Sequence, residues 1–210
     1  MSITAGHRTV HLWALCEDVV LEPGEHKDQL VLSGPWGKER IDSPDPVVRE
    51  ALRRMELGPV LLANIESGTE EPQGRVGAYL VLLPLLTRLS HLLVRTLGLD
   101  DLGGPLLSVS PVSQAAPFAL VRLPAGRPVR LPADVSLSLG AKGFALESSD
   151  SAYRVVLHRP EAVWVVAMLA WPITPADASA ALPLPAAVTK NILDYLAAAG
   201  MAAPADADTP

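Results

Sequence analysis

Cysteine is almost absent from this chain of 210 residues, in which Cys16 stands alone. A lone cysteine forms no disulfide within the chain, so the sequence excludes a small secreted domain held together by disulfides. Cys16 follows the apolar run 13–15, which predicts that it packs as a small hydrophobic residue in a reducing compartment. Aromatic residues are also few, with four Trp, three Tyr and two Phe. We therefore expect a cytoplasmic globular protein with a mainly aliphatic core.

An excess of basic residues is also missing, because 17 Lys and Arg face 23 Asp and Glu and the formal net charge is −6. Proteins that bind duplex nucleic acid through its phosphates need clustered cations. Arg49, Arg53 and Arg54 lie close together but are interleaved with glutamates, and we interpret them as a solvated face. The expected last helix has Lys190 as its only cation. Nucleic acid is therefore not a predicted partner.

No uninterrupted apolar stretch is long enough to cross a membrane. The most apolar part, 76–97, contains Pro84, Arg88, His91 and Arg95, whereas a spanning helix needs about 20 apolar residues in succession. We predict instead a long buried helix over this stretch, with its Arg and His side chains on one polar stripe. The first ten residues also lack the apolar core of a secretion signal.

Sequence motifs for catalysis are missing as well. The chain has no Gly-x-Ser-x-Gly elbow and no glycine-rich phosphate loop of standard spacing. His7 and His11 are four residues apart, but the residues between them favour a strand, where this spacing does not bring two ligands to one metal. The acidic pairs 70–71 and 100–101 lie in polar loops. We predict no catalytic, cofactor-binding or metal-binding residue in this chain.

Both parts of the chain show short strands followed by helices. In the first part, a helix is expected to begin at Pro46, after the N-cap candidates Ser43 and Asp45. Its strands are expected at Thr9–Leu15, Val19–Glu22, Leu30–Ser33 and Lys38–Ile41. In the second part, strands are expected at 135–139, 144–147 and 153–157, and helices at 160–170, 175–181 and 185–199.

Composition divides the chain into four segments. Residues 1–99 are predicted to form a first unit that includes the long helix. Residues 100–132 are rich in Gly and Pro, with short strand-like pieces at 106–109 and 118–123, and are predicted to connect it to a second unit, residues 133–201. Residues 202–210 are small and acidic, and we expect this tail to be disordered.

The two units resemble each other at a separation of 114 to 116 residues. Asp18-Val19-Val20-Leu21 aligns with Asp134-Val135-Ser136-Leu137, and the helices beginning at Pro46 and Pro160 then follow. Repeats report architecture directly. We therefore predict an α+β fold with two related winged-helix-like units, each a three-stranded antiparallel wing plus helices, joined by a long helix and a Pro/Gly-rich linker.

A three-stranded wing beside an apolar helix can accept an extended peptide as a fourth strand. In the second unit this predicts a peptide-binding site formed by the third strand and the last helix. The predicted residues are Tyr153, Arg154, Val155, Val156, Leu157, Ile192 and Tyr195. Simple core packing is the alternative interpretation of these residues.

Several segments together resemble the N-terminal, non-catalytic region of SagB-type azoline dehydrogenases, which help to make thiazole- and oxazole-containing ribosomal peptides. The segments that carry the resemblance are 19–24, 30–37, 83–91, 146–148 and 153–158. In that family, the region precedes a nitroreductase-like domain that holds flavin mononucleotide (FMN). The present sequence has no positions matching that domain, so no flavin-binding residue can be carried over.

The resemblance implies an accessory scaffold or leader-peptide-binding protein, without enzymatic activity of its own. Its expected partners are a precursor peptide and a separate FMN-dependent dehydrogenase or cyclodehydratase, in a homo-oligomer or hetero-oligomer. Two alternatives remain open at this point. One is a winged-helix transcriptional regulator, and the other is a subunit that completes the active site of a flavoenzyme complex.

Overall fold

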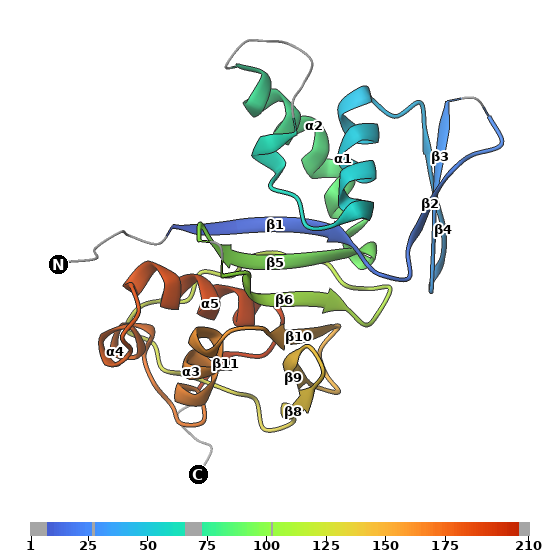
Figure 1. Cartoon of the computed structure of the whole chain (residues 1–210). Coiled ribbons are helices and arrows are strands. Elements are labelled where there is room, and N and C mark those ends of the chain that lie inside the picture. Colours follow the sequence, from blue (N-terminus) through green and yellow to red (C-terminus); the bar gives the residue numbers. More distant parts are fainter. Residues whose placement is uncertain (1–7, 27, 66–72, 102, 206–210) are drawn as a thin grey trace.

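The computed structural model describes residues 8–26, 28–65, 73–101 and 103–205. It is a mixed α+β structure with antiparallel sheets, as predicted. Figure 1 shows a large sheet, with helices α3, α4 and α5 from the second half of the chain lying beside it. Helices α1 and α2 and a small three-stranded sheet lie beyond strand β1, at one edge of the large sheet.

The large sheet contains six antiparallel strands drawn from both halves of the chain. In spatial order they are β1 (Thr9–Leu15), β5 (Leu93–Leu99), β6 (Pro105–Pro111), β10 (Tyr153–Leu157), β9 (Gly143–Glu147) and β8 (Ser136–Gly140). Strand β6 comes from the segment predicted to connect the units, and it pairs with both β5 and β10. Backbone hydrogen bonds therefore join the two halves through the middle of one sheet.

The first half also forms the small sheet and the first hydrophobic core. Its elements are β2 (Val20–Pro23), β3 (Gln29–Gly34), β4 (Gly37–Asp42), α1 (Pro46–Leu57), the 3₁₀ turns η1 (Leu62–Asn64) and η2 (Ser90–Leu92), and α2 (Gln73–Arg88). Helix α1 begins as predicted, since the Asp45 carboxylate accepts a hydrogen bond from the Val47 N–H at 2.8 Å. Val48, Ala51, Leu52 and Met55 recur at helical spacing and form its buried face.

The second half contains α3 (Pro160–Met168), α4 (Pro175–Ala181) and α5 (Ala186–Ala198). These helices confirm the three that were predicted there. Helix α3 packs on β6 and β10, and α5 packs on β1 and β5. The second core lies between these helices and the large sheet, and includes Leu107, Val155, Val165 and Ile192.

The predicted long helix over 76–97 is wrong in its second part. Helix α2 ends at Arg88, and strand β5 follows from Leu93. Nearly all residues of β5 are buried, because the strand lies between β1 and β6 and is covered by side chains. A strand buried on both faces does not alternate between apolar and polar residues, so periodicity does not distinguish it from a buried helix. None of the helices within the described residues is long and apolar enough to cross a membrane.

The predicted repeat has a counterpart in strand pairing. Strands β2, β3 and β4 pair in the same order as β8, β9 and β10, and a helix follows each set. The register is also equivalent. The pair Val20–Ser33 corresponds to the pair Ser136–Glu147, and the pair Val31–Arg40 corresponds to the pair Ala145–Val156. The two units therefore share one three-stranded arrangement.

Two expectations for irregular segments differ from the structure. The strand-like piece 118–123 forms no strand. At the C-terminal end, part of the segment expected to be disordered is ordered. Ala203–Pro204 form β11, which pairs with β7 (Val129–Arg130), and residues 206–210 lie outside the described residues. Short strands such as β11 depend on a distant partner, so local composition does not reveal them.

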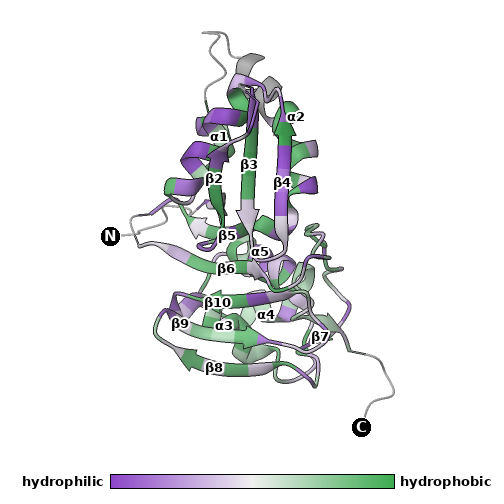
Figure 2. Cartoon of the chain, turned by 90° about the vertical axis from the view of Figure 1, so that its right-hand side faces the viewer, coloured by the Kyte–Doolittle hydropathy of each residue, from purple (hydrophilic) through white to green (hydrophobic). Residues whose placement is uncertain are grey.

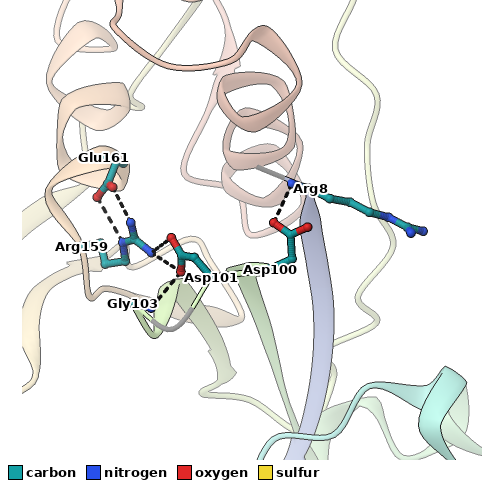
Figure 3. A network of polar contacts seen from close by, with 6 residues as sticks. All are labelled: Arg8, Asp100, Asp101, Gly103, Arg159 and Glu161. Carbon is teal, nitrogen blue, oxygen red and sulfur yellow. Dashed lines mark hydrogen bonds and ion pairs between the residues drawn. The ribbon is translucent and has the colours of Figure 1, made fainter. Parts of the chain in front are cut away.

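A polar network attaches the turn after β5 to the start of α3 (Figure 3). The Arg159 guanidinium donates to both carboxylate oxygens of Asp101 at 2.9 and 3.0 Å and to Glu161 at 2.6 Å. Asp100 accepts a hydrogen bond from the Arg8 N–H, which fixes the beginning of β1 to the same turn. Paired carboxylates in the sequence therefore serve structural contacts here.

Candidate peptide-binding edge

Strand β10, which was predicted to accept a peptide, lies inside the large sheet. Strand β6 pairs with one side of β10 from Tyr153 to Leu157, and β9 pairs with the other side. A strand with neighbours on both sides has no free edge for a further strand. The prediction of strand addition at β10 is therefore wrong, because the connecting segment supplies β6 to that edge.

The predicted site residues divide between the two faces of β10 and helix α5. The buried ones are Tyr153, Val155, Leu157, Ile192 and Tyr195. Arg154 lies on the opposite face with Val156, and its Nε is 3.1 Å from a carboxylate oxygen of Glu147. The buried β10 and α5 side chains therefore pack together in the second core and do not line an open site.

A buried cation lies among the aromatic side chains of this region. Arg95 of β5 is only 7% exposed, and its guanidinium carbon is 2.9 Å from the Trp13 ring centroid and 5.6 Å from that of Phe118. The Phe118 ring also packs against Tyr153 and Tyr195, each with a centroid separation of 5.6 Å. Within the described residues, Arg95 Nε has no hydrogen-bond partner. Cation–π contact is therefore the main local compensation for this charge.

Burial shifts the pKa values in this cluster. It lowers the pKa of Arg95 to about 9, raises that of Tyr153 to about 12, and raises that of Tyr195 above its ordinary value. The Tyr195 hydroxyl lies 2.9 Å from Nδ1 of His11, whose pKa is lowered by burial. The pKa values of the two tyrosines and of His11 move away from 7, and that of Arg95, although lowered, stays well above it, whereas general acid–base catalysis at neutral pH favours a pKa near 7. The cluster is suited to packing between the two halves.

The strand equivalent to β10 in the first half is β4, and one of its edges is open. Strand β3 pairs along the full length of β4, and no other strand of the described residues pairs with β4. Arg88 donates a hydrogen bond to the Arg40 carbonyl at 3.2 Å, so this carbonyl points away from β3. Because backbone groups alternate in an antiparallel pair, Lys38 and Asp42 also direct their N–H and C=O groups to this edge.

The opposite edge of the small sheet is blocked. The Leu21 N–H of β2 donates to the Glu56 carboxylate of α1 at 3.2 Å. Pro23, at the end of β2, has no N–H to offer. Strand β4 is therefore the edge of the small sheet that can receive an additional strand.

Helix α2 lies on the β4 side of the small sheet, whereas α1 lies on the β2 side (Figure 2). Val81, Pro84 and Arg88 follow one another at spacings of four residues or fewer, so they share one face of α2. Arg88 reaches the β4 edge from this face. Leu80, Val81 and Pro84 are exposed there. We call the free edge of β4 (Lys38, Arg40, Asp42) with these four α2 residues the β4–α2 surface.

The β4–α2 surface is locally basic on an acidic protein. Lys38, Arg40 and Arg88 contribute three cations, against the carboxylates of Asp42 and, on the other face of β4, Glu39. Strand β4 is held to the segment after α2, because Glu39 lies 3.8 Å from the His91 Nε2 atom. Backbone pairing, apolar contacts and cations at this surface suit an extended acidic peptide with apolar side chains.

Other candidate sites are weaker. A shallow hollow of about 500 Å³ is lined mostly by alanine side chains of α4 and α5, with Lys190 engaged by Asp194. Burial raises the pKa of Cys16 to about 12, which keeps the thiol protonated at neutral pH. Arg53 and Arg54 both bind Glu50. Among the described residues, no group of three His, Cys, Asp or Glu side chains is placed to hold a metal.

The site residues predicted from the sequence lie in the second unit and do not include β4. The repeat itself contained the signal, because Tyr153–Leu157 is equivalent to residues 37–41. The repeat does not show which of the two third strands, β4 or β10, pairs with a strand from another segment. No protein-family model matches the sequence, and no curated protein matches it either.

Proposed function

We propose that this chain is a non-catalytic accessory protein with two winged-helix-like units, and that the first unit binds an extended peptide along β4. The observation that supports this most strongly lies in the second unit. There, β6 lies antiparallel on β10, the strand equivalent to β4, over five consecutive residue pairs. The same three-stranded arrangement thus already holds a fourth strand once within this molecule.

The proposed peptide would pair antiparallel with residues 37–41, as β6 pairs with Tyr153–Leu157. Its N–H and C=O groups would bond to those of Lys38, Arg40 and Asp42 on the free edge. Arg88 would leave the Arg40 carbonyl and contact an acidic side chain of the peptide. Apolar peptide side chains would lie against Leu80 and Val81 of α2.

The resemblance to the non-catalytic region of SagB-type azoline dehydrogenases gives the proposed peptide an identity. It would be the leader of a ribosomally made precursor that becomes azole-containing. In this proposal, the chain presents that precursor to a separate FMN-dependent dehydrogenase or cyclodehydratase, and the flavin belongs to that partner. The locally basic β4–α2 surface supports an acidic leader.

Fluorescence anisotropy tests the proposal with a labelled leader peptide of an azole-containing precursor. Arg40→Pro removes an N–H from the free edge but leaves the bonds between β3 and β4 in place. We expect at least a tenfold rise in Kd (about 1.4 kcal/mol). Leu21→Pro places proline at the blocked edge and should leave the Kd unchanged. Equal affinities for the wild type and Arg40→Pro, or no saturable binding at micromolar concentration, would contradict the proposal.

A further inference from the structure

Strand β8 forms the outer edge of the large sheet and pairs only with β9 among the described residues (Figure 2). All five of its residues, Ser136–Gly140, are exposed. They include two large apolar side chains, Leu137 at 50% exposure and Leu139 at 75%. Exposed leucines on a free edge are unusual enough to require an explanation.

The two leucines continue the buried face of the sheet. Leu137 is opposite Leu146 on β9, and Leu139 is opposite Phe144. Leu146 belongs to the second core, and Phe144 packs against that core. Helices α3 and α5 pack over β1, β5, β6 and β10, so the apolar face extends beyond them to β8.

The β8 edge lacks the protection that the β1 and β2 edges have. Strand β1, at the opposite edge of the large sheet, exchanges two backbone hydrogen bonds with Val60 at 2.8 and 2.9 Å. Strand β2 is blocked by Glu56, whereas the charged residues of β4 belong to the proposed peptide-binding edge. Residues 136–140, in contrast, contain neither a charge nor a proline. Natural edges usually contain such a device against pairing with another strand.

The hydrogen-bonding groups of β8 are also available for pairing. Gly140 and Gly143 close a hairpin around two turn residues, Ala141 and Lys142. A two-residue hairpin is closed by a hydrogen-bonded pair, and such pairs alternate along the strands. Leu137 and Leu139 therefore direct their N–H and C=O groups away from β9, to the free edge.

We propose that β8 binds β8 of a second copy of this chain, antiparallel and centred on Ser138. This register places Leu137 of each copy opposite Leu139 of the other, so the exposed leucines cover one another. The interface is self-complementary, as a twofold axis requires. It also brings the turn with Lys142 of one copy, which pairs with Glu17 of its own chain, to the Asp134 end of the other, so that a cation approaches a further carboxylate at both ends of the pairing.

The two copies would thus share one continuous sheet. A second copy fits this edge better than an unrelated peptide, because the alternation of serine and leucine in β8 matches itself in this register. The β4–α2 surface belongs to the other sheet, so pairing at β8 does not use its edge. The proposal is independent of peptide binding at β4.

Sedimentation equilibrium tests the pairing directly. The wild type should approach twice the 22.2 kDa chain mass with increasing concentration. Leu139→Lys should sediment as a monomer, because the charge replaces an apolar contact and its desolvation opposes pairing. Leu57→Lys changes a leucine of α1 that is 78% exposed and serves as the matched control, which should remain dimeric. Circular dichroism should be the same for all three proteins.

A mixture of two variants tests the register. Leu137→Glu should also be monomeric alone, but mixed with Leu139→Lys it should form a dimer, since the new charges lie opposite each other in the proposed register. A monomeric wild type at all concentrations would overturn the proposal. A Leu139→Lys variant that dimerises as well as Leu57→Lys would overturn it equally, and failure of the mixture to dimerise would rule out this register.

Discussion

The two three-stranded arrangements have the same strand order and equivalent registers, but they leave opposite edges open. In the first unit the third strand, β4, is open and the first strand, β2, is blocked by Glu56. In the second unit the third strand, β10, is covered by β6, and the first strand, β8, is open. The available edges are therefore decided by segments outside the two three-stranded arrangements.

This difference suggests a division of roles between the units. In the second unit, β6 covers the edge of β10 and also pairs with β5, which pairs with β1. The third strand of the second unit is therefore joined to the first unit and has no free edge. The open third strand of the first unit provides the proposed peptide edge. The open first strand of the second unit provides the proposed contact with a second copy.

Weakening the packing of β6, the strand that covers the edge of β10, should have the largest effect on the free energy of unfolding. Leu107 of β6 is fully buried in the second core. Leu107→Ala should lower the free energy of unfolding by about 2–5 kcal/mol, because it leaves a cavity between β6 and the helices. Urea denaturation followed by circular dichroism measures the loss. Val112→Ala, just beyond β6 and exposed, should change it by less than about 0.5 kcal/mol. Similar losses for both variants would contradict a filled edge.

Replacing Arg95, at the junction of the units, should have the opposite effect and raise the free energy of unfolding. Its charge is buried without an ion pair in the described residues, and the Trp13 ring compensates it only in part. Arg95→Met keeps a long side chain without the charge and should raise the free energy of unfolding by about 1–3 kcal/mol. Thermal denaturation at neutral pH measures the gain. Arg122→Met, at an exposed position, should have little effect. A destabilised Arg95→Met variant would show that cation–π contact outweighs the desolvation of the guanidinium.

The equivalent helices α1 and α3 differ in N-terminal capping, and removing the cap of α1 should have a smaller effect on the free energy of unfolding. Asp45 caps α1, whereas the N-cap residue of α3, Arg159, makes no side-chain cap. Asp45→Ala should lower the free energy of unfolding by about 1 kcal/mol, measured by urea denaturation. Asp18→Ala, in the exposed turn after β1, is the control and should leave it unchanged. A neutral Asp45→Ala would indicate that Pro46 alone sets the helix start.

The smallest expected effect concerns pH. Burial lowers the pKa of His11 in the folded protein, so its contribution to stability is complete above the unfolded pKa of about 6.5. That contribution decreases as pH falls from about 6.5 toward the folded pKa, because the unfolded chain binds the proton first. Thermal denaturation between about pH 7 and 5 should therefore show a smaller decline for His11→Asn than for the wild type. Parallel curves would assign the decline to other groups, including His158, whose pKa is also lowered by burial.

The local elements were largely predictable from the sequence. Strands Thr9–Leu15 and Tyr153–Leu157 and helix Pro175–Ala181 begin and end where their patterns indicate, because each has an alternating or helical apolar pattern bounded by turn residues. Strand β5 was not predictable in this way. Burial on both faces removes the alternation that identifies a strand.

The candidate site was predictable only in part. The repeat identifies equivalent third strands, but whether β4 or β10 is open depends on β6, which pairs with residues more than 40 positions away in the chain. No local pattern in 105–111 indicates this partner. The blocked β2 edge likewise depends on Glu56, a residue of a later helix. Edges are properties of the assembled sheets, so the structure was needed to locate them.

The most direct test of the central claim is hydrogen exchange of the β4 amides with and without the leader peptide. We predict that the Lys38, Arg40 and Asp42 amides, which point to the free edge, exchange more slowly when the peptide is bound, while the β10 amides do not change. Saturable peptide binding that leaves the β4 amides unprotected, or protects β8 in their place, would contradict this claim.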